Sequence, residues 1–364
     1  MRLLVLALLV LAQATPKGGF FKTPYPLDEM RDKQAVIETD AGRIVIALLP
    51  EAAPNHVGHF LKLAREGAYD GTIFHRVIRY GLIQGGDPLS KDPAKAAQYG
   101  TGGLNLLKSE VNAEKHTAGA VSAVLQPNQP DSAGAQFFIC ASDQPQLDGS
   151  FTVFGRIVDG LEVVQKLSAV EADEQGRPKA RHVIRKVTIR DTPPVPFSRE
   201  SAAELAAYRA VLETTKGEIA LEFLPAIAPG HVRNFLQLAA AGVYDGTPFH
   251  RVVKGFVIQG GALAHRATPL TSSQQKFVRT LPPEFSETPN GEGTVSMARG
   301  DDPASASTSF FICVGQCRTL DGKYTVFGRV AAGMDVVKAI ESLEVDGETP
   351  KEPIVVTKVR VEKR

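Results

Sequence analysis

The sequence has almost no net charge and no apolar run long enough to cross a membrane. It contains 41 lysines and arginines against 40 aspartates and glutamates in 364 residues. Capture of nucleic acid or of an anionic membrane usually relies on a marked basic excess, so this balance indicates neither partner. The apolar stretch at residues 3–11 is about half of the ~20 residues that a spanning helix needs. We therefore expect no membrane span in the mature protein.

Residues 1–14 have the pattern of an export signal. Arg2 supplies the positive charge, the apolar stretch follows, and Ala12, Gln13 and Ala14 form a small-residue cleavage pattern. A membrane anchor is the alternative, but the stretch is short, and no cysteine follows the cleavage pattern for a lipid to modify. We expect an exported protein, periplasmic or secreted, that begins near Thr15, with residues 15–34 as an N-terminal lead-in.

Cysteine is scarce, and tryptophan is absent. Cys140 and Cys313 lie at matching places in two apolar FFIC runs, which is typical of buried single thiols. A disulfide between Cys313 and Cys317 is the alternative. A strand separates residues four apart by too much for the bridge geometry, so this disulfide requires the strand to end between them.

The motifs of common hydrolases and metalloenzymes are missing as well. Neither G-x-S-x-G nor H-E-x-x-H occurs, which argues against a serine hydrolase and a zinc protease. His56 and His59 are spaced to share one helix face, but no third ligand lies nearby in the sequence. His75 and His250 follow strand patterns and are interpreted as structural. We predict no metal site.

The sequence does contain one long repeat. The run FHRVVKGFVIQGG at residues 249–261 returns as FHRVIRYGLIQGG at residues 74–86, and YDGT, FFIC, LDG and VFGR also occur twice in the same order. A repeat this long indicates a duplicated domain. In each run, alternation along a strand would bury apolar residues on one face and leave an arginine and a glutamine on the other.

Each copy begins with a hairpin, at residues 35–49 and 210–224, followed by an amphipathic helix near Pro54 or Pro229. Short strands, a second helix after Gly160 or Gly333, and a closing strand complete the copy. Many short strands with only two helices predict a mainly β fold, an antiparallel barrel or sandwich.

The domain boundary falls in a proline-rich stretch. The run from Asp191 to Pro196 contains three prolines and is expected to form a stiff connector that cannot continue a sheet. Ser201 and Glu204 have the spacing of a capping box, which predicts a short helix. We place domain 1 at residues 35–191, the linker with its helix at 192–208, and domain 2 at 209–364.

With YDGTxFHR, QGG, FFIC, LDG and VFGR in this order, the chain resembles the cyclophilins, a family of peptidyl-prolyl cis-trans isomerases, in both halves. The resemblance covers residues 35–190 and 210–361. It implies two tandem eight-stranded antiparallel β-barrels, each capped by two α-helices, with a peptide groove on the outer surface and no cofactor. It also implies that the substrates are X-Pro bonds of proline-containing polypeptides.

The residues present suit that reaction. Amide rotation has a barrier of about 18–20 kcal/mol, whereas cis and trans X-Pro forms differ by only ~1 kcal/mol. A fixed donor that meets the prolyl nitrogen as conjugation breaks, beside an apolar pocket for the ring, would suffice. In domain 2 we assign the donor to Arg251, a pocket wall to Phe256 and the holding of the substrate carbonyl or of the arginine to Gln259. The other predicted substrate-binding residues of domain 2 are Met297, Ala298, Arg299, Phe311, Leu320 and Tyr324.

These assignments depend on the residues occurring together. Phe311 or Leu320 alone would more often be plain core, and Arg251 alone a surface ion pair. In domain 2, Ser309 stands where the family usually has glutamine, so the contact that this glutamine makes to the peptide backbone is not carried over to this chain.

Domain 1 departs further from the family. Five predicted site residues keep matching positions: Arg76, the catalytic donor, and the substrate-binding residues Gln84, Gln136, Phe138 and Leu147. Gly81, however, stands where domain 2 has Phe256, and alternation would point the neighbouring Tyr80 to the other face. Val124, Leu125 and Phe151 replace Ala298, Arg299 and Tyr324, which either repacks the groove or adapts it to a different apolar segment.

Two classes of function follow. The first is a peptidyl-prolyl isomerase that acts on exported or extracytoplasmic proteins, mainly through domain 2. The alternative is a non-catalytic proline-peptide-binding or holdase module, for which domain 1 is the better candidate. Arginine substitution separates the two, because catalysis should collapse while peptide binding persists. The sequence indicates no oligomeric state.

Cyclosporin sensitivity is expected to be weak in both domains. Tight binding in the family depends on a tryptophan just before the Leu-Asp-Gly run, where this chain has Gln146 and Thr319. The large flat contact and the indole donor are therefore missing. Calorimetry on each domain should show weak binding, and nanomolar affinity in either would contradict the prediction.

Overall fold

The computed structural model describes residues 19–364. The predicted signal peptide, residues 1–14, and the first four residues of the lead-in lie outside the described residues. The described chain divides between Thr192 and Pro193 into two compact units, domain 1 and domain 2.

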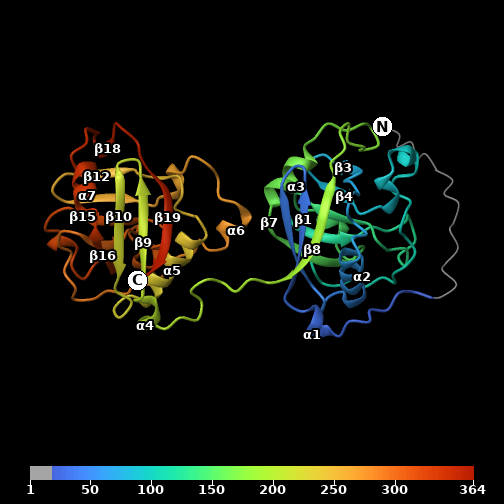
Figure 1. Cartoon of the computed structure of the whole chain (residues 1–364), viewed down its shortest axis with the longest axis horizontal. Coiled ribbons are helices and arrows are strands. Elements are labelled where there is room, and N and C mark those ends of the chain that lie inside the picture. Colours follow the sequence, from blue (N-terminus) through green and yellow to red (C-terminus); the bar gives the residue numbers. More distant parts are fainter. Residues whose placement is uncertain (1–18) are drawn as a thin grey trace. The chain divides into compact units, whose positions relative to one another are not determined.

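Domain 1 is built on one eight-stranded antiparallel sheet in the order β3-β4-β6-β5-β7-β2-β1-β8 (Figure 1). Its strands are β1 (Lys33–Thr39), β2 (Arg43–Leu48), β3 (Arg76–Ile78), β4 (Leu82–Gly85), β5 (Ala120–Ala123), β6 (Phe137–Cys140), β7 (Val153–Asp159) and β8 (Ile184–Asp191). Its helices are α1 (Leu27–Met30), α2 (Pro54–Arg65) and α3 (Leu161–Ser168). Helix α1 is a single turn within the lead-in, so α2 and α3 are the two helices that belong to the barrel. The predicted eight strands with two capping helices are therefore confirmed in domain 1.

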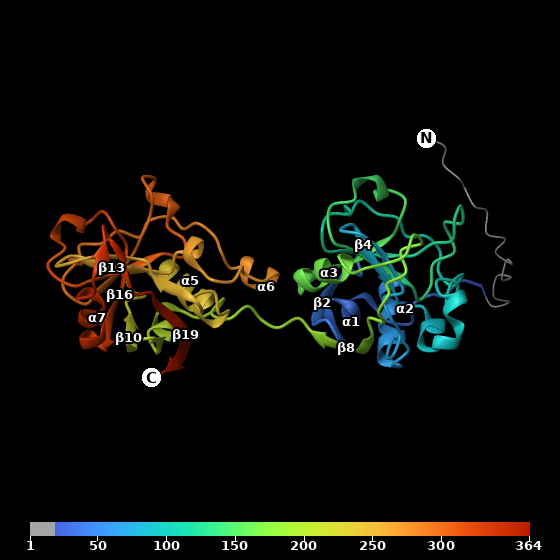
Figure 2. The same cartoon turned by 90° about the horizontal axis from the view of Figure 1, so that it is seen from above.

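Helix α2 begins at Pro54, as predicted, since proline suits the first helical position. Its buried side chains, among them Val57 and Phe60, belong to the domain core. The short α1 packs against α2 (Figure 2). Helix α3 follows Gly160, which has φ of 86° and where a Cβ would lie 2.2 Å from the carbonyl oxygen of Arg43. Only glycine fits at that position.

A carboxylate that sequence reasoning did not identify binds the start of α2. Glu110 accepts hydrogen bonds from the backbone N–H groups of Asn55 and His56, and its Oε2 lies 2.7 Å from His56 Nδ1. Burial alone raises the pKa of Glu110, but the hydrogen bonds from His56 and Asn55 outweigh it and lower the pKa below the ordinary value. Glu284 binds the start of helix α5 (Pro229–Ala240) in the same way.

Substituting Glu110→Gln should therefore destabilise helix α2. We expect the free energy of opening to fall by about 1–2 kcal/mol at neutral pH, because charge-assisted bonds to a helix N-terminus are lost. A carboxylate whose pKa is lowered by folding stabilises the folded protein at pH values above its unfolded-state pKa. This stabilisation is lost as the pH falls through the folded-state pKa. Hydrogen exchange of the α2 amides should show the difference at pH 7 and a smaller one below the ordinary carboxyl pKa. Equal protection at pH 7 would contradict this role.

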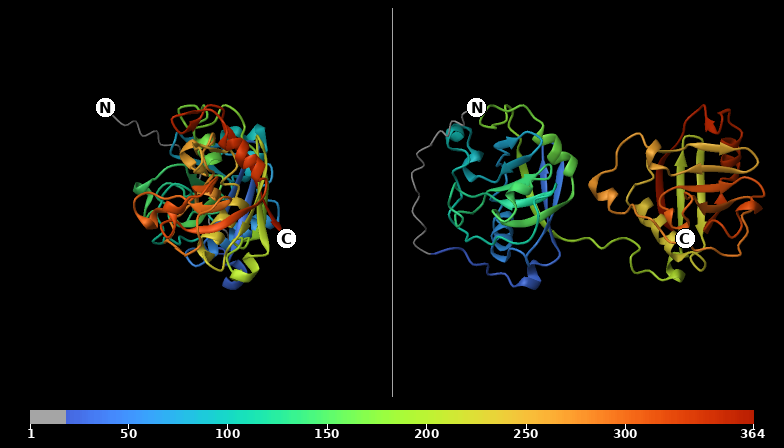
Figure 3. Two further views of the ribbon diagram at one scale, coloured as in Figure 1. Left: turned by 90° about the vertical axis from the view of Figure 1, so that its left-hand side faces the viewer. Right: turned by 180° about the vertical axis from the view of Figure 1, so that it is seen from behind.

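Domain 2 repeats the arrangement with nine strands in the order β11-β19-β9-β10-β16-β14-β15-β13-β12. The strands are β9 (Tyr208–Thr214), β10 (Gly217–Phe223), β11 (Thr247–Phe249), β12 (Arg251–Val253), β13 (Val257–Gly260), β14 (Thr294–Met297), β15 (Phe310–Cys313), β16 (Val326–Ala332) and β19 (Ile354–Lys363), and β17 (Val345–Asp346) pairs with β18 (Thr349–Pro350) in a separate hairpin. The helices are α4 (Ala202–Leu205), α5, α6 (Ser272–Gln275) and α7 (Met334–Glu341). In the view from behind, the red β19 runs beside the yellow β9 (Figure 3, right).

The ninth strand explains how the sheet closes. Strands β11 and β12 occupy the two ends of the strand order, yet only His250 separates them in the chain. The same stretch of chain thus joins both edges and closes the barrel. In domain 1 the counterpart of the β11–β19 pairing is an isolated bridge between Ile73 and Val183. The strand count therefore differs from the expected eight without a change of topology.

The linker differs slightly from expectation at its start. Asp191 is the last residue of β8 and pairs with Lys33, so the sheet continues one residue into the predicted connector. The predicted capping box is confirmed. Ser201 Oγ accepts from the backbone N–H of Glu204, and Glu204 Oε2 accepts from the backbone N–H of Ser201 at 2.7 Å.

Each domain has two apolar clusters. The larger fills the barrel and includes Phe60 and Phe137 in domain 1, and Phe235 and Phe310 in domain 2. The smaller lies on the other face of the strands, around Phe138 in domain 1 and Phe311 in domain 2. Adjacent phenylalanines thus belong to different clusters, as strand alternation requires. The smaller cluster positions the candidate site.

Candidate functional site

Four strands of domain 2 place the predicted polar and apolar site residues in one row. In the sheet register Arg251 on β12 pairs with Gln259 on β13, Gln259 pairs with Phe311 on β15, and Phe311 pairs with Ser296 on β14. Their neighbours Val252, Ile258 and Ile312 are buried in the barrel core. Alternation therefore puts this row on the outer face.

The Arg251 side chain lies along that face. Its Nη1 is 3.4 Å from Gln259 Oε1, and 36% of the side chain is exposed. On its other side Nε and Nη2 bind the carboxylate of Glu348, a partner that sequence reasoning did not identify. The arginine is held between two acceptors and still reaches solvent, so its remaining N–H groups can donate to a bound molecule.

An apolar cluster adjoins the row. Val257, Phe311, Cys313 and Cys317 are buried in it, and five partly buried residues pack around them: Val253, Phe256, Ala298, Leu320 and Tyr324. The rings of Phe311 and Tyr324 meet edge to face, with centroids 5.5 Å apart. The partly buried members leave apolar surface open beside the arginine. The structure thus brings Phe256, Ala298, Leu320 and Tyr324 together with Phe311.

One predicted contact lies elsewhere, and another lies at the rim of the site. Met297 was predicted to line the pocket, but it is 1% exposed and belongs to the barrel core. The reason is alternation along β14, which directs Val295 and Met297 inward and leaves Ala298 on the outer side. Arg299 stacks over the Tyr324 ring at 4.8 Å and donates from Nε and Nη2 to the carbonyl oxygen of Lys323. Arg299 therefore lies at the rim.

A small cleft lies beside the row, next to Ser309. It has a volume of about 240 Å³ and is lined by Gln259, Ala298, Arg299, Gly300, Ser305, Ser307, Thr308 and Ser309. The backbone N–H of Ala298 binds the carbonyl oxygen of Ser309 at 2.9 Å. The cleft offers hydroxyl and backbone groups to an extended peptide.

The arginine and the glutamine on the outer face, here called the polar row, are also present in domain 1. There a second glutamine extends the row. Arg76 Nη1 lies 3.3 Å from Gln84 Oε1, Gln84 Nε2 donates to Gln136 Oε1 at 3.1 Å, and Gln136 Nε2 donates to the carbonyl oxygen of Gly102. Phe138 and Leu147 belong to the adjoining apolar cluster. Among the described residues Arg76 forms no ion pair.

The ring wall of domain 1 is absent, as the sequence indicated. Tyr80 has φ of 57° and is 60% exposed, and its ring lies under the guanidinium of Arg79. It does not join the apolar cluster. An ideal Cβ at Gly81 would lie 3.1 Å from Ile78 Cγ2 and 3.5 Å from Gln144 Nε2, so a polar side chain adjoins the position from which the wall would extend. The role of Gln144 had no signal in the sequence, because it depends on how a distant loop returns to the strand.

The remaining substitutions in domain 1 act in different places. Val124 packs against the outer cluster together with Phe151, whose ring meets Phe138 edge to face at 5.4 Å. Leu125 instead packs against the barrel core. Only Val124 and Phe151 therefore change the groove directly.

The cysteines are free and buried. Strand β15 ends at Cys313, and the chain turns so that Cys317 rejoins the same cluster. The Cys317 thiol donates to the carbonyl oxygen of Phe256 at 2.9 Å. Burial raises the pKa of Cys317, and raises that of Cys140 to about 12, which suits structural thiols.

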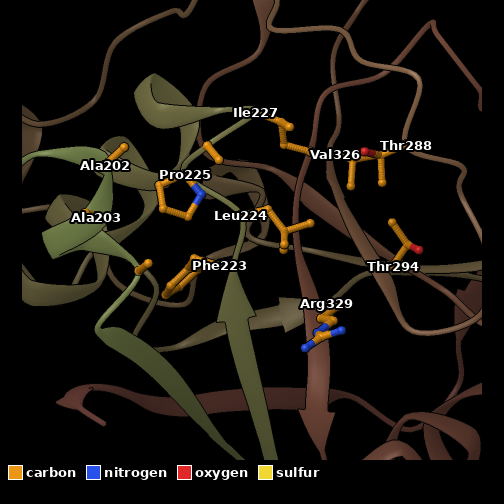
Figure 4. A pocket seen from close by; sticks show the side chains of 13 residues that line it. Ala202, Ala203, Phe223, Leu224, Pro225, Ile227, Thr288, Thr294, Val326 and Arg329 are labelled. Atoms are coloured by element: carbon orange, nitrogen blue, oxygen red, sulfur yellow. The ribbon is translucent and has the colours of Figure 1, made fainter.

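A larger pocket of domain 2 lies outside this row (Figure 4). It has a volume of about 690 Å³ and is lined mostly by apolar side chains, among them Phe223, Leu224 and Pro225, together with Thr288, Thr294 and Arg329. Neither Arg251 nor the ring cluster around Phe311 contributes to it. This pocket is larger than the cleft beside Gln259, but it is not the candidate site because it lacks these residues.

Among residues 19–364, we find no helix with the length and apolar character needed to cross a bilayer.

Comparison with known proteins assigns both halves to one family. Residues 35–189 and 209–361 match the family described as cyclophilin type peptidyl-prolyl cis-trans isomerase/CLD. The chain is 34% identical over 146 residues to peptidyl-prolyl cis-trans isomerase CYP18-2 of Arabidopsis thaliana, which covers 40% of this chain and 86% of that protein. It is 38% identical over 142 residues to peptidyl-prolyl cis-trans isomerase ppi1 of Schizosaccharomyces pombe, covering 39% and 89%. A probable peptidyl-prolyl cis-trans isomerase of Brucella suis is 38% identical over 163 residues, covering 43% and 83%.

Proposed function

This chain belongs to the family of cyclophilin-type peptidyl-prolyl cis-trans isomerases, and from that premise we propose that domain 2 carries its principal catalytic site. The observation that carries the proposal is that the arginine and glutamine of domain 2 lie beside Phe256, where domain 1 has Gly81. Arg251 and Gln259 lie beside a cluster that still includes Phe256, Phe311 and Leu320. Domain 1 has the arginine and the glutamine but no aromatic wall at Gly81.

In the proposed mechanism, the proline ring of the substrate sits on the apolar surface of Phe256, Phe311 and Leu320. The ring is thereby held while the preceding carbonyl turns. As the amide leaves planarity, its nitrogen gains a lone pair, and an N–H of Arg251 donates to it. This interaction exists only in the twisted state, so it lowers the barrier without stabilising the planar substrate.

Gln259 supports this geometry in two ways. Its Oε1 lies 3.4 Å from Arg251 Nη1 and helps to fix the guanidinium. It also lies in the small cleft with Ala298 and Ser309, where a peptide backbone would pass. A peptide bound there would place its proline on the cluster and its flanking residues along the cleft.

For domain 1 we propose weak isomerisation or proline-peptide binding. A cleft of about 560 Å³ lies beside Arg76, lined largely by residues of the segment 169–176. The donor is present, while the space of the missing wall adjoins Gln144. Peptide binding with slow turnover would fit this arrangement.

We also propose that the clients are exported proteins. The support is the sequence pattern of residues 1–14, a charged start, an apolar stretch and a small-residue cleavage pattern. N-terminal sequencing of protein recovered from outside the cytoplasm should begin near Thr15. Recovery of the uncleaved chain in the cytoplasm would contradict this proposal.

The catalytic proposal is tested by measuring isomerisation of an X-Pro tetrapeptide for each domain produced alone. We expect domain 2 to have the higher kcat/KM and domain 1 to have residual activity. Equal activity in the two domains would contradict the assignment of the principal site. Tight peptide binding by domain 1 with no turnover would favour the non-catalytic alternative for that domain.

A further inference from the structure

The hairpin formed by β17 and β18 places a carboxylate directly on the proposed catalytic arginine. Glu348 lies in the turn between these strands, and its Oε2 is 2.5 Å from Arg251 Nε. Its Oε1 lies 3.2 Å from Arg251 Nη2, so the pair is bidentate and approaches the side of the guanidinium. The backbone anchors the same residue, because the N–H of Val252 donates to the carbonyl oxygen of Glu348 at 2.7 Å.

Domain 1 has the same backbone anchor without the carboxylate. There the N–H of Val77 donates to the carbonyl oxygen of Gly176 at 2.7 Å, so Gly176 corresponds to Glu348. Gly176 has φ of 79°, and a Cβ on it would lie 2.4 Å from the carbonyl oxygen of Val77. A glutamate cannot be placed there without moving the backbone. The two domains thus differ in whether a charged group holds the arginine.

The pairing determines which N–H groups of Arg251 remain for a substrate. A guanidinium carries five N–H groups in a rigid fork. Glu348 occupies Nε–H and one N–H of Nη2, and Gln259 lies against one N–H of Nη1. One N–H on each terminal nitrogen is left, and both point away from the Glu348 side of the group. The ion pair on one side and the amide on the other fix the plane of the fork.

We propose that Glu348 is a positioning residue that holds the guanidinium of Arg251 in the orientation required by the twisted amide. This inference rests on the proposed role of Arg251. The ion pair is exposed, with 36% of the Arg251 side chain and 54% of the Glu348 side chain accessible, so it contributes little to folding. Its effect is on the preorganisation of the donor, which is felt in the turnover step.

The test uses full-length protein that carries Arg76→Ala, so that turnover reports domain 2. In this background Glu348→Gln should lower kcat on an X-Pro tetrapeptide by about fivefold, the scale of an exposed charge pair, with KM changed less than twofold. The matched control is Glu344→Gln, which removes a carboxylate from the same hairpin region. Glu344 pairs with Lys351 at 3.2 Å, 83% of its side chain is exposed, and it makes no contact with Arg251. This control should leave kcat and KM unchanged.

A double-mutant cycle with Arg251→Ala separates positioning from a general effect on the hairpin. If Glu348 acts through the arginine, Glu348→Gln causes no further loss once Arg251 is alanine. An equal fractional loss with and without Arg251, or a kcat for Glu348→Gln that equals that of Glu344→Gln, overturns the proposal. The proposed function fails separately, when Arg251→Ala itself leaves turnover unchanged. Collapse with Arg251→Ala and no effect of Glu348→Gln overturns only the role of Glu348.

Discussion

Replacing Arg251 by alanine is expected to remove most of the isomerase activity of domain 2 while the domain stays folded. The arginine is the only group in the described outer row of domain 2 that can donate a charge-assisted hydrogen bond to the amide nitrogen. Loss of one preorganised donor in other enzymes lowers the rate by about 10²- to 10³-fold. We expect a loss of this size in kcat/KM on an X-Pro tetrapeptide, measured in full-length protein that carries Arg76→Ala.

Arg329→Ala provides a control on the same sheet. Arg329 lies on β16, 67% of its side chain is exposed, and it pairs with Glu222 at 3.0 Å. It belongs to neither the polar row nor the outer cluster, so its loss should leave turnover and the thermal midpoint unchanged. An Arg251→Ala variant with near wild-type turnover and an unchanged midpoint would remove Arg251 from the mechanism.

Periodicity and the repeat predicted a mainly β fold, a barrel or a sandwich, and placed the arginine and the glutamine on one face, whereas the eight-stranded barrel followed from the resemblance to the cyclophilins. Arg251 and Gln259 were expected on one face because alternation along two short strands leaves few alternatives, and the structure has them paired in register. Met297 shows where the same reasoning was misapplied. It lies two residues after the inward-facing Val295, so alternation itself assigns it to the barrel core.

The groups that sequence reasoning missed come from loops that are distant in the chain. Glu348 reaches Arg251 across 97 positions, and Glu110 reaches the start of α2 across 54 positions. Gln144 reaches Gly81 only because the segment after β6 folds back onto the turn. The periodicity of the sequence does not predict such contacts, because each contact depends on where a turn ends in space and not on the pattern of residues within the turn. The duplication nevertheless helps, because Gly176 and Glu348 become comparable once their backbone anchors are seen.

Domain 1 is expected to gain activity when the turn of domain 2 is copied into it by Tyr80→Gly with Gly81→Phe. The two domains carry the same turn with its residues exchanged: Gly255 has φ of 72° before Phe256, whereas Tyr80 has φ of 57° before Gly81. Gly81 itself has no positive φ, and a Cβ there would lie 3.1 Å from Cγ2 of the exposed Ile78 side chain, which must shift slightly to admit phenylalanine. Burying a phenylalanine side chain is worth roughly 1.5–3 kcal/mol, which corresponds to about one to two powers of ten in binding of the proline ring.

The measurement is kcat/KM on an X-Pro tetrapeptide for full-length protein that carries Arg251→Ala, so that turnover reports Arg76. The exchange should raise kcat/KM by about tenfold or more. Adding Gln144→Cys should raise it further, because it removes the polar amide that lies 3.5 Å from the new Cβ. Tyr80→Gly alone is the control. It relieves the left-handed backbone conformation but adds no wall, so stability should rise without a gain in turnover. The reciprocal Phe256→Gly should lower kcat/KM of domain 2 by about 10- to 100-fold. If Phe256→Gly changes nothing, or if domain 1 already equals domain 2 before the exchange, the aromatic wall is not what separates the two sites.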